Sequence, residues 1–215
     1  MIELFISSFV TLFVVLDPPG CVPIFSGLTS GATPEHRRAM AWRSTIIAGV
    51  VLLLFGVFGE GFLGALGISL AAFKIAGGIM VFLIAIDMVF EKRTERRENR
   101  AQEVTRDAEA AHREIAAEDI SVFPMGIPML AGPGSIASIM LLMAKSRSIE
   151  QSLVVLAALA AVLGLTALAL LAAGPLMRLM GKKLEAMITR LLGVILAALA
   201  AQFVIDGLRE AFKLA

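Results

Sequence analysis

The sequence predicts an all-α membrane protein with six transmembrane helices, arranged as a 3+3 inverted repeat in which helices 1 and 4 are broken by Pro and Gly. Composition supports a membrane protein: of 215 residues, 58% are hydrophobic and 17% are charged. Soluble domains average about 45–50% apolar and about 25% charged residues. The repeat is predicted by two apolar segments, 6–20 and 120–134, which read as copies of one element.

Six segments are long and apolar enough to cross a bilayer, which takes about 20 residues of α-helix. Backbone polar groups in lipid are satisfied internally, so we expect these segments to be helical. Glu60 and several glycines mark a short turn at 60–72, between the second and third spans. The six segments are 3–27, 40–59, 67–90, 120–143, 151–173 and 187–208.

Lysine and arginine orient the spans, because cytoplasmic loops carry an excess of basic residues. The loops after spans one, three and five, with their flanks, hold fourteen basic residues, and the opposite side holds five. We therefore expect these loops in the cytoplasm and both termini outside, in the periplasm. The fourteen are Arg37, Arg38, Arg43, seven residues within 91–119, Arg178, Lys182, Lys183 and Arg190.

The two copies, ISSFVTLFVVLDPPG and ISVFPMGIPMLAGPG, are related by an offset of 114 residues and share six identities. A second similarity, at an offset of 116, relates 73–82 in the third span to 189–198 in the sixth. Each copy has three spans, an odd number, so the copies run in opposite directions across the membrane. The identical pairs are Ile6/Ile120, Ser7/Ser121, Phe9/Phe123, Leu16/Leu130, Pro19/Pro133 and Gly20/Gly134.

A charged connector separates the two repeats. Residues 91–119 carry nine acidic and seven basic residues among many alanines, which is typical of a solvated, partly helical segment. The chain therefore divides into a first three-helix repeat (1–90), this connector, and a second three-helix repeat (120–215).

Proline interrupts the first span within its apolar run. Pro18 and Pro19 lack an amide hydrogen and clash with the carbonyl four residues earlier. Asp17 precedes a proline, which disfavours helical torsions. We expect one helix to stop and another to begin, with Asp17 as N-cap and Pro18 at the first position. In the second copy, prolines and glycines predict the same arrangement. The expected site residues are Asp17, Pro18, Pro19, Gly20, Pro23, Pro128, Gly132, Pro133, Gly134, Ser135 and, in the sixth span, Gln202.

Such breaks expose two kinds of chemistry. Free amide groups and the positive end of a helix dipole attract an anionic group, such as a carboxylate. Freed carbonyls attract a cation or an ammonium group. Two breaks that meet near the midplane would fit a zwitterion, and an amino acid is the smallest common metabolite of that kind. Duplicated broken spans point to a transporter's binding site, although prolines also kink helices that bind nothing.

Polar residues within the spans have more than one interpretation. Asp17 lies closest to the middle of a span, where a charge is costly and by default suggests a function. It is expected to bind a coupling ion, to cap its own half-helix, or both; its equivalent in the second copy is Ala131. Gln202 and Asp206 are four residues apart, so they share a helix face that could line a cavity. Lys74 is expected to extend to the lipid headgroups.

The chain resembles the MarC family of bacterial inner-membrane proteins over essentially its full length. The resemblance lies in LDPPGCVPIF, LGISLAAFKIAGGIMVFLIAIDMVFEKR and ISVFPMGIPMLAGPGSIASIM, with DPPG and AGPGS as the most specific parts. It implies six spans in the bacterial inner membrane and a relation to small exporters of the LysE family. Some relatives are described as neutral amino-acid transporters. The family's marked positions correspond here to the expected site residues of the two breaks.

We therefore expect a secondary transporter of a small solute, a neutral amino acid, that works by alternating access with H+ or Na+ as coupling ion and no cofactor. Its partners would be the solute and the bilayer. Glycines of the third and sixth spans would serve a homodimer or packing within one chain. A net charge of +1 gives no case for nucleic acid, and one cysteine with two histidines makes a zinc site improbable. A membrane channel, a non-transporting membrane factor and an intramembrane enzyme are the alternatives; the spans contain no histidine for the last.

Overall fold

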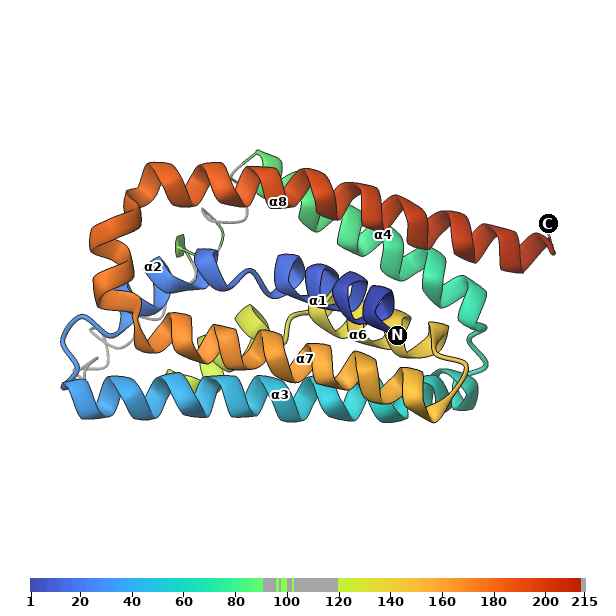
Figure 1. Cartoon of the computed structure of the whole chain (residues 1–215), viewed down its shortest axis with the longest axis horizontal. Coiled ribbons are helices and arrows are strands. Elements are labelled where there is room, and N and C mark those ends of the chain that lie inside the picture. Colours follow the sequence, from blue (N-terminus) through green and yellow to red (C-terminus); the bar gives the residue numbers. More distant parts are fainter. Residues whose placement is uncertain (91–95, 97, 100–101, 103–119, 214–215) are drawn as a thin grey trace.

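The computed structural model describes residues 1–90, 96, 98–99, 102 and 120–213, and every regular element among them is helical (Figure 1). The connector expected at 91–119 lies almost entirely outside the described residues. The elements are α1 (Ile2–Leu16), α2 (Pro18–Leu28), α3 (Pro34–Ala65), α4 (Leu70–Val89), η2 (Ser121–Leu130), α6 (Pro133–Lys145), α7 (Ile149–Leu171) and α8 (Ala173–Phe212).

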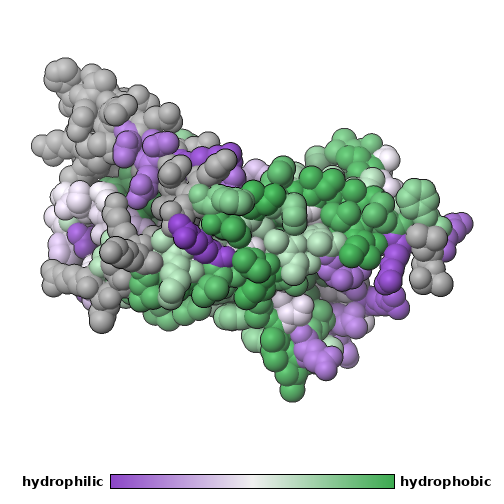
Figure 2. Space-filling model, turned by 90° about the horizontal axis from the view of Figure 1, so that it is seen from above, coloured by the Kyte–Doolittle hydropathy of each residue, from purple (hydrophilic) through white to green (hydrophobic). Residues whose placement is uncertain are grey.

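Five segments of the described chain are long and apolar enough to span a bilayer. They are α1 with α2, α3, α4, α7 and the part Ala186–Phe212 of α8. The elements η2 and α6, bent by 54°, add a sixth if the pair is counted as one span. Figure 2 shows apolar side chains over the middle of the molecule and most polar side chains toward its ends. An exposed apolar belt of this extent fits contact with lipid.

The long helices lie roughly along one axis, and both termini lie toward the same end (Figure 1). α3 packs against α7, α4 packs along α8, and α1 and α6 lie between these two pairs. In Figure 1, α6 runs in the opposite direction to α1, α7 to α3 and α8 to α4.

The turn between the second and third spans is shorter than predicted. α3 continues through Glu60, and only residues 66–69 form the turn, in which Gly67 has a φ of 71°. A Cβ at Gly61 or Gly64 would meet nothing within 4 Å, so these glycines perform no special task. An isolated glycine costs a helix only about 1 kcal/mol. In lipid, ending the helix costs more, because no water satisfies the freed backbone groups.

The fifth and sixth spans are joined by helix, where our predicted spans leave a loop at 174–186. α8 begins at Ala173, directly after α7, and continues without interruption for 40 residues. Pro175 falls in its first turn, where proline is tolerated. The lysine, leucine, methionine, glutamate and alanine residues that follow are good helix formers. A polar stretch made of such residues can therefore be helical, and its polarity does not by itself indicate a loop.

Glycines bring α4 and α8 into backbone contact. A Cβ at Gly78 would lie 3.0 Å from the Ala200 carbonyl oxygen, and one at Gly207 would lie 2.9 Å from that of Ala71. Gly193 makes a similar approach to α4. Glycines of the third and sixth spans thus serve packing within one chain.

Candidate functional site

The first helix break is centred on Asp17. This residue ends α1 and caps α2, with φ 54° and ψ 63° in the left-handed region, which Asp tolerates better than most residues. Its side chain is buried, and Oδ1 accepts a hydrogen bond of 3.1 Å from the Gly20 amide. Pro18 occupies the first helical position. The predicted stop and restart of the helix, with Asp17 as N-cap, is confirmed.

The first turn of α2 satisfies its own amides. Pro18 and Pro19 have no amide hydrogen, Gly20 donates to the Asp17 side chain, and Cys21 donates to the Asp17 carbonyl oxygen at 3.1 Å. A Cβ on residue 20 would lie 2.2 Å from Asp17 Oδ2, so this close contact requires glycine. The Asp17 carboxylate also lies at the positive end of the α2 dipole, which favours a negative charge.

The second break has the same position but a different lead-in. α6 begins at Pro133, with Gly132 as N-cap, as predicted for the second copy. The preceding element, η2, is not a regular α-helix: two of its residues have extended torsions, and the peptide bonds before Pro124 and Pro128 are cis. Two prolines within ten residues remove amide donors from the helical pattern. The second copy is therefore more irregular than the first.

The start of α6 lacks the carboxylate that caps α2. Ala131 stands where the first copy has Asp17, and no side chain caps the helix. The Ile136 amide donates to the Gly132 carbonyl oxygen at 3.0 Å. The amides of Gly134 and Ser135 donate to no group among the described residues. Both residues are buried, and within the part of the chain that the structure describes their amides have no acceptor.

The two breaks adjoin each other. A Cβ at Gly134 would lie 3.7 Å from Val15 Cγ1 and 2.2 Å from Ile84 Cδ1, so the first turn of α6 packs against α1 and α4. From this point α2 and α6 run toward opposite ends of the molecule (Figure 1). The start of α6 therefore lies against the end of α1, next to the first break.

Ten of the eleven expected site residues belong to these breaks. Pro23 lies one turn into α2, and Pro128 lies before the second break, with its carbonyl oxygen 2.5 Å from the position of a Cβ on Gly132. Six of the ten are buried, three are half-buried and Pro133 is exposed. The buried six are Asp17, Pro18, Gly20, Gly132, Gly134 and Ser135.

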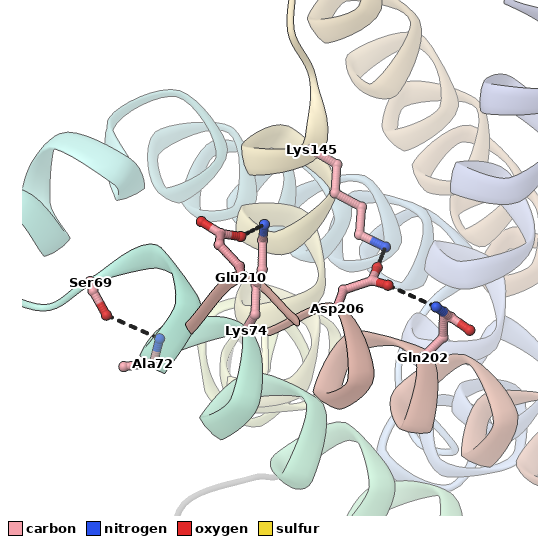
Figure 3. A network of polar contacts seen from close by, with 7 residues as sticks. All are labelled: Ser69, Ala72, Lys74, Lys145, Gln202, Asp206 and Glu210. Atoms are coloured by element: carbon pink, nitrogen blue, oxygen red, sulfur yellow. Dashed lines mark hydrogen bonds and ion pairs between the residues drawn. The ribbon is translucent and has the colours of Figure 1, made fainter. Parts of the chain in front are cut away.

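The eleventh, Gln202, lies elsewhere. It is exposed and donates a hydrogen bond of 2.7 Å to Asp206, which is paired at 2.5 Å with Lys145 (Figure 3). Lys145 is the last residue of α6, about 18 Å from the break at 1.5 Å per residue. Gln202 and Asp206 do share a helix face, as predicted, but that face is polar at the end of the bundle and not at the breaks.

Lys74 does not extend to the headgroups, contrary to our prediction. It is buried and paired at 2.5 Å with Glu210 (Figure 3). Lys145 Nζ lies 4.8 Å from the centroid of the Phe203 ring, within cation–π range. We call the five charged and amide residues the terminal cluster: Lys74, Lys145, Gln202, Asp206 and Glu210. It ties α6 and α4 to α8 at the end that holds both termini. Opposite charges at the ends of three spans were the only sign of it in the sequence.

The chain matches a known family of membrane proteins. Residues 2–212 match the model of the family described as MarC family integral membrane protein. The chain belongs to the MarC family. This confirms the resemblance found in the DPPG and AGPGS segments.

Several relatives match this MarC protein over nearly its whole length. It is 39% identical to the UPF0056 membrane protein MJ1677 of Methanocaldococcus jannaschii over 98% of each chain. It is 36% identical to the UPF0056 membrane protein YvbG of Bacillus subtilis, over 99% of this chain and 97% of that one. The UPF0056 inner membrane protein YhgN of Escherichia coli is 34% identical, over 97% and 98%. No solved structure matches the chain.

The names of these three relatives describe membrane proteins and mention no reaction. The MarC protein is an integral, multi-pass membrane protein, and its relative YhgN is an inner membrane protein. None of the three names refers to an enzyme. Among the described residues, no three His, Cys, Asp or Glu side chains gather where they could hold a metal ion.

Proposed function

We propose that this MarC protein is a secondary transporter of a small solute, a neutral amino acid, working by alternating access around two broken helices. One observation supports this most directly: α2 and α6 both begin within the bundle at corresponding positions of the two halves, and the start of α6 packs against the end of α1. Interrupted helices at matched positions supply backbone amides and carbonyls for a solute at the midplane.

An inverted repeat would give the protein two related conformations, each open to one side. The opposite directions of α1 and α6, α3 and α7, and α4 and α8 support a 3+3 inverted repeat (Figure 1). The α4–α8 contact supports it further, since Gly78 of α4 approaches α8 and Gly193 of α8 approaches α4. In such transporters one unit rocks against the other around a fixed site.

The position of Asp17 suits a coupling site. It is a carboxylate buried at the junction of α1 and α2, directly at the proposed site. Uptake or release of H+, or binding of Na+, at this carboxylate would change its bond to Gly20 and so the geometry of the break. We place the end with Arg37, Arg38 and Arg43 in the cytoplasm of a bacterium, and both termini outside.

The test is uptake of labelled alanine and glycine into proteoliposomes, with and without a proton or sodium gradient. We expect saturable, gradient-dependent uptake, and we expect Asp17→Asn to abolish it or to uncouple it from the gradient. Glu60→Gln is the control, because Glu60 is an exposed acid on α3 away from both breaks. Absence of flux from folded protein under every gradient would overturn the proposal. Flux without saturation would indicate a channel.

A further inference from the structure

α4 and α8 form one unit that is held together by backbone contacts. A Cβ on Gly78, Gly193 or Gly207 would lie 2.9–3.1 Å from a backbone carbonyl oxygen of the opposite helix. Gly193 and Gly207 are about 21 Å apart along α8, at 1.5 Å per residue. Contact between two backbones over this length keeps the helices from separating, because closely packed interfaces do not deform continuously.

α6 is joined to this unit through side chains. Within the described chain, α6 packs along α3 and α4 but not along α8. Its contact with α4 includes the end of a leucine side chain, since a Cβ on Gly77 would lie 3.1 Å from Leu141 Cδ1. At its start, α6 is bent by 54° from η2 across residues 131–132. A short break between two elements is the kind of segment that serves as a hinge.

The other end of α6 reaches α8 through Lys145. Its Nζ atom pairs at 2.5 Å with Asp206 and lies 4.8 Å from the centroid of the Phe203 ring (Figure 3). These contacts bridge two helices that do not pack along each other. The side chains of Lys145 and Asp206 are 34% and 25% exposed. A partly exposed ion pair contributes little to stability, so this connection can open and close reversibly.

The second ion pair of the terminal cluster has a different position. Lys74 and Glu210 join α4 to α8, which the glycine contacts already hold together. Separating these two side chains would leave the backbones of α4 and α8 in contact. The cluster therefore contains one ion pair between two units and another within a single unit.

We infer that the Lys145–Asp206 pair is a gate at the end of the bundle that holds both termini. With the pair formed, α6 is fixed to α8 and the first break is closed, as its buried Asp17 shows. When the pair separates, α6 turns at residues 131–132 away from the α4–α8 unit, and the breaks become accessible from this end. The inference rests on the proposed function and adds the gate that alternating access requires.

The experiment measures the distance between α6 and α8 by pulsed electron paramagnetic resonance in phospholipid nanodiscs. Spin labels are attached to Arg147→Cys, two residues beyond α6, and Arg209→Cys on α8, in protein carrying Cys21→Ser. Arg147 and Arg209 are both exposed. We expect a shorter and a longer distance, which correspond to the closed and open gate.

Variants of the ion pair should shift these populations. Lys145→Ala removes the ion pair and the cation–π contact, so we expect the ratio of longer to shorter distance to rise about fivefold. Asp206→Asn, which changes shape less, should shift the ratio in the same direction. The exchange of charges in Lys145→Asp/Asp206→Lys should bring the ratio back toward its starting value, which a loss of packing alone would not do.

Two controls separate the gate from general loosening. Glu210→Gln breaks the ion pair within the α4–α8 unit and should leave the distances between positions 147 and 209 unchanged. Labels at Ala72→Cys on α4 and Arg209→Cys, both exposed positions, should give one distance that Lys145→Ala does not alter. Distances between positions 147 and 209 that Lys145→Ala and Asp206→Asn leave unchanged would overturn the inference. Equal shifts in the control pair would do the same.

A second measurement locks the gate. In Cys21→Ser protein, Lys145→Cys and Asp206→Cys are bridged by a bis-methanethiosulfonate reagent, and alanine flux is followed in proteoliposomes. We expect the bridge to stop the flux and dithiothreitol to restore it, while each single cysteine variant keeps its flux after the same treatment. Flux that continues through the bridged protein would refute the gate and keep the transporter. A shift of distances with Lys145→Ala in protein that shows no flux would refute alanine transport and keep the movement of α6.

Discussion

The Asp17 carboxylate accepts a 3.1 Å hydrogen bond from the Gly20 amide, and a Cβ on residue 20 would lie 2.2 Å from the other carboxylate oxygen. Asp17 and Gly20 therefore act together. The Asp17 carboxylate caps α2, and the absence of a side chain on Gly20 leaves room for that carboxylate. In the similar segment 120–134, Gly134 is present and the acid is not. The two breaks therefore differ in whether a side chain caps the new helix.

Gly20→Ala should displace the Asp17 side chain and break the cap. We expect a loss of about 1–2 kcal/mol in the free energy of unfolding, the usual range for a lost N-cap, and a lower midpoint by circular dichroism. Gly27→Ala in the same helix is the control, because a Cβ there meets nothing within 4 Å. Equal midpoints for the two variants would contradict the role assigned to Gly20.

Gly207→Ala should separate α4 from α8. The added Cβ would lie 2.9 Å from the Ala71 carbonyl oxygen, a backbone atom that cannot rotate away. Overpacking of this kind costs about 1–3 kcal/mol, measurable as a lower unfolding midpoint. Gly164→Ala on α7, where a Cβ meets nothing within 4 Å, should leave the midpoint unchanged or raise it. A Gly207→Ala protein as stable as Gly164→Ala would show that the α4–α8 contact is less tight than the structure indicates.

Lys145→Ala should loosen the end of α6. The side chain holds Asp206 and the Phe203 ring, both on α8, and we assign these contacts about 1 kcal/mol together. The readout is the rate at which N-ethylmaleimide labels Ser138→Cys in protein whose only cysteine, Cys21, is replaced by serine. We expect labelling about fivefold faster, the factor for 1 kcal/mol.

The control for that prediction is Glu210→Gln, which breaks the other ion pair of the terminal cluster. Lys74 and Glu210 join α4 to α8 and leave α6 untouched. Labelling of the cysteine at position 138 should then stay near the starting rate. Equal acceleration by both variants would mean that the cluster stabilises the whole bundle and not α6 in particular.

The features predicted correctly were those that depend on neighbouring residues. Apolar length located the spans, and the pair Asp17–Pro18 located a helix restart, because a proline acts on the residue before it and on the carbonyl four residues earlier. The family resemblance came from the same short segments. These effects act between residues close in the sequence, so they can be recognised from the sequence alone.

The predictions that were wrong concern features that depend on tertiary contacts. The continuation of α3 past Glu60 and the helix across 174–186 depend on where the backbone can be satisfied, which polarity alone does not reveal. Gln202 shares a helix face with Asp206, as predicted, but its place in the terminal cluster depends on Lys145 of another helix, which the helical pattern of α8 does not reveal. Lys74 was expected in the headgroups because its partner, Glu210, is distant in sequence.

The candidate site could be predicted only in part from the sequence. The contrast between Asp17 and Ala131 could be seen in the aligned copies, but it acquires meaning from the unbonded amides of Gly134 and Ser135 and from the adjoining breaks.

If this MarC protein is a carrier, it should perform counterflow. Proteoliposomes are loaded with a high concentration of unlabelled alanine and diluted into a trace of labelled alanine without any ion gradient. We expect transient accumulation of label above equilibrium, because a carrier returns from each exit with an external solute bound. Label that only equilibrates, or never enters vesicles containing folded protein, would contradict alternating access.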